Sequence, residues 1–188
     1  MSSKSITFVS QNEDKYKELK PLFDENDIDV RFINDAIKEI QSDNLAEIIK
    51  EKTLVAFRRV ARPVLVDHAG LFVKAWGEMP GGLTQLFWDK LLGEKICKML
   101  SVFSDKSAVA KAALGFCDGK RLFLKSQGAL EGRIADRPRG GGFQWGSIFL
   151  PKGYTKVYSE LEIDERNKIS HRASAFAAFL KTWKEINP

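Results

Sequence analysis

Cysteine is scarce in this chain: Cys97 and Cys117 are the only two among 188 residues. Two cysteines are too few for a disulfide framework and lack metal-ligand spacing, so we expect two buried free thiols. The sequence also has no run of about 18 apolar residues, so no membrane-spanning helix is expected. The apolar stretch 6–9 is too short for the core of a signal peptide, which predicts a cytoplasmic protein.

Neither sign of charge dominates. Lys and Arg number 30 against 25 Asp and Glu, a net charge of +5, and basic pairs such as Arg58-Arg59 stand among acidic neighbours. The basic patch with interleaved aromatics that is typical of nucleic-acid binding is missing, and a small polyanion such as a triphosphate would account for the excess equally well. A nucleic-acid-binding module stays the alternative, which salt-sensitive DNA binding would mark.

The chain has the composition of an ordinary globular protein. Hydrophobic residues make up 44%, and 13 Phe and 4 Trp can supply a large core, so residues 1–188 are predicted to form a single domain. Short runs rich in β-formers predict strands over 6–10, 29–33 and 64–67, the last of which ends at Asp67. A hairpin is predicted over 108–117 and 121–131, across the turn dipeptide Asp118-Gly119.

Helices are predicted between these strands. One runs from a cap at Asn12 to about Asn26, and a second follows a cap at Ser42 or Asp43 and ends before Pro63. Two more cover 83 to about 102 and the segment from Ser170 onward, and 137–142 is a loop. Strands that alternate with helices around a long hairpin predict an α/β fold with a mixed sheet.

The segment Ser10-Gln11-Asn12-Glu13-Asp14-Lys15 stands at a strand-to-helix turn. Helix N-termini expose free N–H groups and carry a positive partial charge, so they bind phosphate well. Lys15, one turn into the helix, adds a point charge. The alternative is an ordinary helix cap followed by a solvated lysine.

Asp67 and His68 form the second candidate site. A carboxylate at the C-terminal end of a core strand lies where open α/β sheets bind ligands. An ordinary turn at the end of the strand is the alternative.

Two further segments carry aromatic or basic side chains near a helix start or a glycine turn. In 140–149 (GGGFQWGSIF), Phe143 and Trp145 can stack on a base, although core aromatics are the alternative. Ser170 is placed to cap the last helix, with His171 and Arg172 in its first turn. Positive side chains oppose the helix dipole there, which indicates an electron-rich partner nearby, unless these residues belong to a solvated helix end.

In this order, the segments resemble the Ham1/inosine triphosphate pyrophosphatase family, from about Ser5 to Trp183. The matching positions are Ser10, Asn12, Lys15 and Glu18 in the opening motif, then Glu39, Lys52, the strand 64–71, Met79-Pro80-Gly81, the segment 143–149, and Arg166-Asn167-Lys168-Ile169-Ser170-His171-Arg172.

The resemblance implies an elongated mixed sheet with flanking helices, two lobes around a nucleotide cleft, and usually a homodimer. It also implies magnesium-dependent hydrolysis of inosine, deoxyinosine and xanthosine triphosphates to the monophosphate and pyrophosphate. Glu39 and Asp67 would hold the metal, and Asp67 and His68 stand at the catalytic positions. The substrate would contact Ser10, Asn12, Lys15, Lys52, Phe143, Trp145, Arg166, Ser170, His171 and Arg172.

The chain departs from the family pattern at its catalytic positions. His68 and Gly146 stand where the family has aspartates, and Gln11 and Gln144 replace glycines. Magnesium prefers oxygen ligands, so imidazole is a poor substitute. Because the base-reading residues are largely kept, we interpret the chain as a nucleotide-binding sensor or regulatory subunit that hydrolyses its ligand poorly or not at all.

This pattern is similar to the Ham1-like subunit of the Kongming anti-phage defence system, a resemblance that would imply an effector partner with a SIR2-like NAD-consuming domain. The alternative is an active pyrophosphatase in which His68 serves as the base while Glu39 and Asp67 hold magnesium.

Overall fold

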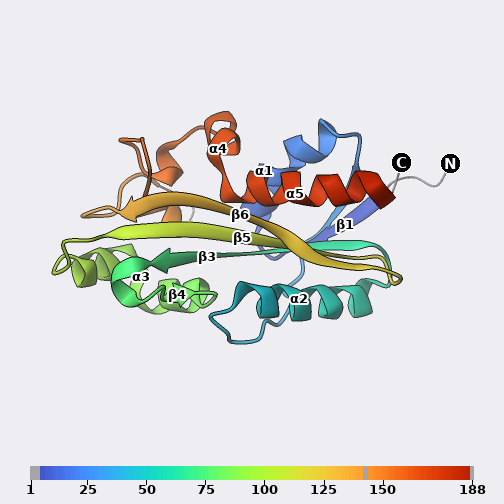
Figure 1. Ribbon diagram of the computed structural model, residues 1–188, viewed down its shortest axis with the longest axis horizontal. Helices are drawn as coiled ribbons and strands as arrows, with labels where there is room; N and C mark the ends of the chain where they lie inside the picture. Colours follow the sequence, from blue (N-terminus) through green and yellow to red (C-terminus); the bar gives the residue numbers. More distant parts are fainter. Residues whose placement is uncertain (1–4, 142–143, 187–188) are drawn as a thin grey trace.

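The computed structural model describes residues 5–141 and 144–186 and arranges them in three layers (Figure 1). A seven-stranded mixed sheet has the strand order β2-β1-β3-β5-β6-β7, and β4 pairs with β3. Helices α1 and α5 lie on one face of this elongated sheet, and α2 and α3 lie on the other (Figure 1). The predicted mixed α/β sheet with flanking helices is confirmed. Within the described ranges, no helix has both the length and the apolar character needed to cross a membrane.

The first half of the sheet is parallel. Strand β1 pairs in parallel with β2 on one side and β3 on the other, and helices α1 and α2 make the connections. These elements are β1 (Ser5–Val9), α1 (Glu13–Asp24), β2 (Asp29–Ile33), α2 (Leu45–Val60) and β3 (Val64–Val73). Helix α2 is capped by Asn44, whose Oδ1 accepts from the N–H of Ala46, and not by Ser42 or Asp43 as predicted.

The second half of the sheet is antiparallel. The predicted hairpin is confirmed, since its two strands pair in antiparallel register. Oδ1 of Asp118 closes the turn by accepting the N–H groups of Lys120 and Arg121. The strands are β4 (Pro80–Gly81), β5 (Ser107–Cys117), β6 (Leu122–Ile134) and β7 (Phe149–Pro151).

Strand β3 is longer than the sequence indicated. It was predicted to end at Asp67, but all ten of its residues pair with β5, from Val64 opposite Cys117 to Val73 opposite Ala108. Gly70 permits this continuation, since a Cβ there would lie 2.2 Å from the carbonyl oxygen of Gly81 on β4. Asp67 and His68 therefore lie in mid-strand and point to opposite faces of the sheet.

The remaining helices are α3 (Thr84–Leu100), α4 (Ile163–Ile169) and α5 (His171–Ile186). Helix α3 is kinked at Leu92, whose φ is 57°, and α4 was not predicted. Short 3₁₀ turns occupy Lys74–Trp76, Gln144–Ser147 and Tyr158–Glu160.

Apolar side chains fill both faces of the sheet. On one face α1 and α5 contribute Phe23 and Phe176, whose rings meet edge to face at 5.0 Å. On the other face α2 packs Ile49 against Val66 and neighbouring strand residues. Both cysteines are buried free thiols, as predicted.

Gly128 on β6 sets the position of α5. A Cβ at Gly128 would lie 2.0 Å from the carbonyl oxygen of His171, so only glycine lets the first turn of α5 approach the strand so closely.

Candidate functional site

The structure contains a cleft of about 800 Å³. Its walls come from the N-terminus of α1, the loop before α2, the middle of β3, the start of α3 and the turn at 144–145. Seven of the residues predicted to form a site line this cleft: Ser10, Asn12, Lys15, Glu39, Lys52, His68 and Trp145.

Other predicted site residues are absent from the described walls of the cleft. Asp67, Ser170, His171 and Arg172 are each no more than 2% exposed and lie behind its surface. Arg166 lies on α4, with its guanidinium carbon 6.0 Å from the ring centre of Tyr158. Phe143 falls outside the described residues.

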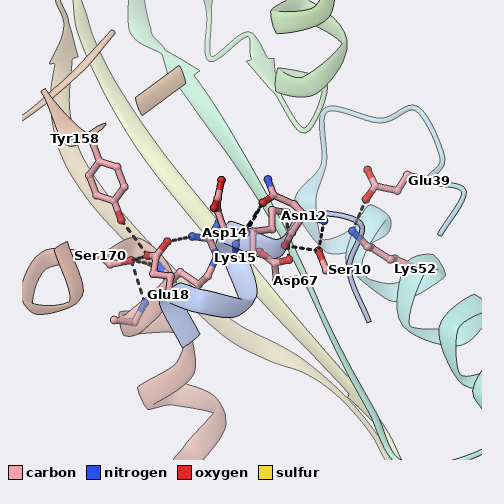
Figure 2. Close-up of polar contacts among 12 residues, drawn as sticks. Ser10, Asn12, Asp14, Lys15, Glu18, Glu39, Lys52, Asp67, Tyr158 and Ser170 are labelled. Atoms are coloured by element: carbon pink, nitrogen blue, oxygen red, sulfur yellow. Dashed lines mark hydrogen bonds and ion pairs between the residues drawn. The ribbon is translucent and has the colours of Figure 1, made fainter. Parts of the chain in front are cut away.

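The N-terminus of α1 is capped by Asn12, as the sequence predicted. Oδ1 of Asn12 accepts the N–H groups of Asp14 and Lys15, at 2.9 and 3.4 Å. The hydroxyl of Ser10 accepts the N–H of Asn12 at 3.1 Å and so fixes the turn that precedes the helix. Ser10 and Asn12 thus hold the helix start in place, and Lys15 extends from the first turn (Figure 2).

Asp67 is a buried counter-ion rather than an exposed carboxylate. Its Oδ1 lies 3.1 Å from Nζ of Lys15, and its Oδ2 accepts from Nε of Arg172 at 3.0 Å. Burial alone would raise the pKa of Asp67, but the charges of Lys15 and Arg172 hold that pKa well below its usual range. Asp67 is thus paired with two cations of the chain, and its assignment as a catalytic group and metal ligand stays a prediction.

Glu18 is a buried residue of the site to which the sequence analysis gave no role. Its carboxylate accepts hydrogen bonds from the hydroxyls of Ser170 and Tyr158, the latter at 3.0 Å (Figure 2). It also pairs with Nη1 of Arg172. Burial opposes ionisation, yet the charge of Arg172 and these hydrogen bonds lower the pKa of Glu18. Its spacing could have indicated that Glu18 belongs to the site, because a residue three positions after Lys15 shares that face of α1.

The start of α5 confirms the predicted cap. The hydroxyl of Ser170 accepts the N–H groups of Arg172 and Ala173, at 3.1 and 3.3 Å. The electron-rich partner expected beside Arg172 is internal, namely the carboxylates of Glu18 and Asp67. Arg172 is 1% exposed, and among the described residues its Nη2 has no hydrogen-bond acceptor.

His171 is buried and neutral. Burial, together with the charge of Arg172, lowers its pKa to about 3. Within the described ranges neither of its ring nitrogens has a hydrogen-bond partner. The ring of Trp145 lies 5.4 Å away and that of Tyr158 5.9 Å away, measured between ring centres. Trp145 is 3% exposed and is itself packed on Tyr158 and Phe149.

On the opposite wall, Glu39 is enclosed by two nitrogen-bearing side chains. Its Oε1 pairs with Nζ of Lys52, and its Oε2 lies 3.2 Å from Nδ1 of His68. Nε2 of His68 lies 3.0 Å from the carbonyl oxygen of Gly82, which is also an acceptor. Both contacts are hydrogen bonds only when each ring nitrogen carries a hydrogen. Burial would raise the pKa of Glu39, but His68 and Lys52 lower it to about 2.

The predicted metal ligands do not fit a magnesium ion. Magnesium takes oxygen ligands in near-octahedral geometry, but the oxygens of Glu39 and Asp67 already pair with nitrogen-bearing side chains. Across residues 5–141 and 144–186, no group of three or more His, Cys, Asp or Glu could hold a metal ion. Gly146 is no part of the described cleft wall, and a Cβ there would point toward Ser159 and Tyr158.

We expect Glu18→Gln to lower the free energy of unfolding by about 3–5 kcal/mol at neutral pH, because Arg172 would lose a buried counter-charge. Glu13→Gln on the same helix is the matched control, since Glu13 is exposed. The control should change stability by less than about 0.5 kcal/mol. Urea denaturation followed by circular dichroism measures both variants.

The effect of Glu18→Gln should also depend on pH. The pKa of Glu18 is lowered in the folded chain, so its contribution to stability is present above the unfolded pKa of about 4.3 and is lost as the pH falls through the folded value. The difference in unfolding free energy between Glu18→Gln and the wild type should therefore shrink as the pH falls below about 4.3. A difference that stays constant in acid would show that Glu18 is not an ionised partner of Arg172.

Comparison with known proteins gives a consistent result. The Ham1 family matches residues 6–182. A dITP/XTP pyrophosphatase of Saccharolobus solfataricus is 36% identical over 177 residues, which cover 93% of this chain and 91% of that protein. Inosine triphosphate pyrophosphatase 2 of Trypanosoma cruzi is 34% identical over 179 residues, which cover 94% and 91%.

The fold agrees with these sequence matches. The structure of a HAM1 protein from Coxiella burnetii superposes with a TM-score of 0.79 at 25% identity, covering 96% of this chain and 98% of that one. The family match spans almost the whole sequence, and two relatives above 30% identity cover more than nine-tenths of it. The chain therefore belongs to the Ham1 family.

Proposed function

We propose that this chain is a cytoplasmic sensor or regulatory subunit that binds a noncanonical purine nucleoside triphosphate, such as ITP, dITP or XTP, and hydrolyses it weakly or not at all. The observation that carries this proposal is the engagement of His68 between Glu39 and Gly82. A ring tied to two acceptors is not free to activate water. The names of the relatives, which are dITP/XTP and inosine triphosphate pyrophosphatases, support the ligand class.

The triphosphate is assigned to the N-terminus of α1. Lys15 and Lys52 border the cleft beside the Ser10 and Asn12 turn, where the dipole of α1 favours an anion. Lysine side chains add charge at the same place, so several phosphate oxygens can be neutralised together.

The base is assigned to the side of the cleft near Trp145. Behind that side chain, His171 is neutral and Nη2 of Arg172 is a buried donor that no described residue uses. A 6-oxo purine offers an acceptor to such donors, whereas the amino group of adenine is itself a donor. Buried donors left unpaired disfavour the wrong ligand, so the site should prefer inosine over adenosine nucleotides.

The first test is catalytic. Because His68 and Gly146 replace family carboxylates, pyrophosphate release from dITP with magnesium should be at least ~10²-fold slower than that of an active Ham1 pyrophosphatase. The active homologue, measured in parallel, is the control. Turnover at the homologue's rate would favour the second candidate function, an active magnesium-dependent pyrophosphatase, to which the relatives' names point.

The second test concerns base recognition. Calorimetry should show ITP binding at least about tenfold tighter than ATP, a step of 1.4 kcal/mol. His171→Phe keeps an aromatic ring against Trp145 and Tyr158 but removes both ring nitrogens. This variant should lose most of the preference through weaker ITP binding, with ATP binding unchanged. Equal affinity of the unaltered protein for ITP and ATP would contradict the assigned role of His171 and Arg172.

The third test concerns signalling. A protein that binds a nucleotide without consuming it acts only by shifting an equilibrium between two states. We therefore expect a complex with an effector, of SIR2-like NAD-consuming type, whose activity rises with dITP. Lys15→Ala should abolish the response while the complex stays assembled, and Lys20→Ala, on the same helix but not on the described cleft wall, is the control. Purification from the native organism with an NAD-consumption assay checks this. Recovery of a homodimer alone, without any dITP response, would refute the sensor role.

A further inference from the structure

The carboxylates at the cleft are already neutralised by the chain itself. Both oxygens of Glu39 are engaged, one by Lys52 and the other by His68 at 3.2 Å. Behind the cleft wall, Oδ2 of Asp67 accepts a hydrogen bond from Nε of Arg172 at 3.0 Å, and Oδ1 lies 3.1 Å from Nζ of Lys15 without a hydrogen bond from any described residue. A divalent ion would have to displace these groups before it found a ligand.

The groups that would be displaced from Glu39 are buried, so there is little room to move them aside. Lys52 is 6% exposed and His68 is 5% exposed. The ring of His68 is also held from behind by the carbonyl oxygen of Gly82 at 3.0 Å. A metal ion entering beside Glu39 would therefore face buried positive or proton-bearing groups at short range, and Coulomb repulsion in a poorly solvated place is strong.

Basic side chains at the cleft can neutralise and position the phosphate oxygens of a triphosphate, as a metal ion does. A metal ion neutralises phosphate oxygens and fixes their positions. Lys15, Lys52 and His68 line one cleft, and each is anchored by a carboxylate that sets its direction. Lys15 and Lys52 thereby hold positive charge at fixed positions beside the start of α1.

We propose that this chain binds its nucleoside triphosphate without a divalent metal, with Lys15 and Lys52 in place of the ion and His68 beside Glu39 in the space that the ion would need. The proposal rests on the proposed function, in that the cleft must bind a nucleoside triphosphate. It goes beyond that function because it removes the metal on which catalysis in this family depends while leaving recognition intact.

The direct experiment is calorimetric titration of the unaltered protein with ITP, once in excess EDTA and once in excess magnesium chloride. The dissociation constants should agree within about threefold, well below a tenfold step. Inorganic tripolyphosphate should compete with ITP in EDTA, because the phosphate contacts alone carry this part of binding. Binding at least tenfold tighter with magnesium would overturn metal independence and leave the proposed function standing. Absence of binding in both buffers would overturn both.

Two substitutions at one position test whether His68 is the determinant. His68→Asp introduces a free carboxylate beside Glu39 and should make ITP binding at least about tenfold tighter in magnesium than in EDTA. His68→Gln is the matched control, since it removes the imidazole without adding a carboxylate. It should bind ITP equally in both buffers. If His68→Asp folds and remains indifferent to magnesium, the role assigned to His68 is wrong.

Discussion

The buried ion pairs of Asp67 constrain the arrangement of the site more than any other contact. Asp67 is 0% exposed in the middle of β3, where an unpaired carboxylate would be very costly. Lys15 must therefore reach it from α1, and Arg172 must reach it from α5. Glu18 supplies the second charge that Arg172 needs and binds Ser170 as well. One buried carboxylate thus fixes the starts of two helices against the sheet.

This arrangement separates the requirements of binding from those of catalysis. Binding a triphosphate needs fixed positive charge and an open cleft, and the paired Lys15 and Lys52 provide the charge. Metal-dependent hydrolysis needs carboxylate oxygens that are free to take a cation. Glu39 lacks such oxygens because His68 and Lys52 hold both of them. His68 on β3 therefore affects the chemistry of the cleft through its contact with Glu39.

The relation to the Ham1 family fits this separation. Fold and ligand cleft can persist across a family while reactivity depends on a few side chains. The sheet and its helices follow the HAM1 protein from Coxiella burnetii. Within this fold His68 lies on the cleft wall, whereas a Cβ at Gly146 would point toward Ser159 and Tyr158.

The sequence by itself determined the local elements and the family. Asn12 and Ser170 were recognised as caps because a side-chain oxygen before an apolar period satisfies free N–H groups nearby. The Asp118-Gly119 turn likewise specified its hairpin from adjacent residues alone. Only the tertiary structure decided how far β3 extends, since its last residues are held by pairing with β5 and by Gly70 against Gly81. It also decided which charges meet: Glu18 and Arg172 are 154 positions apart, and periodicity carries no information about pairing over such a separation. The roles of Asp67 and His68 depend on these long-range partners, so they became visible only once the chain was folded.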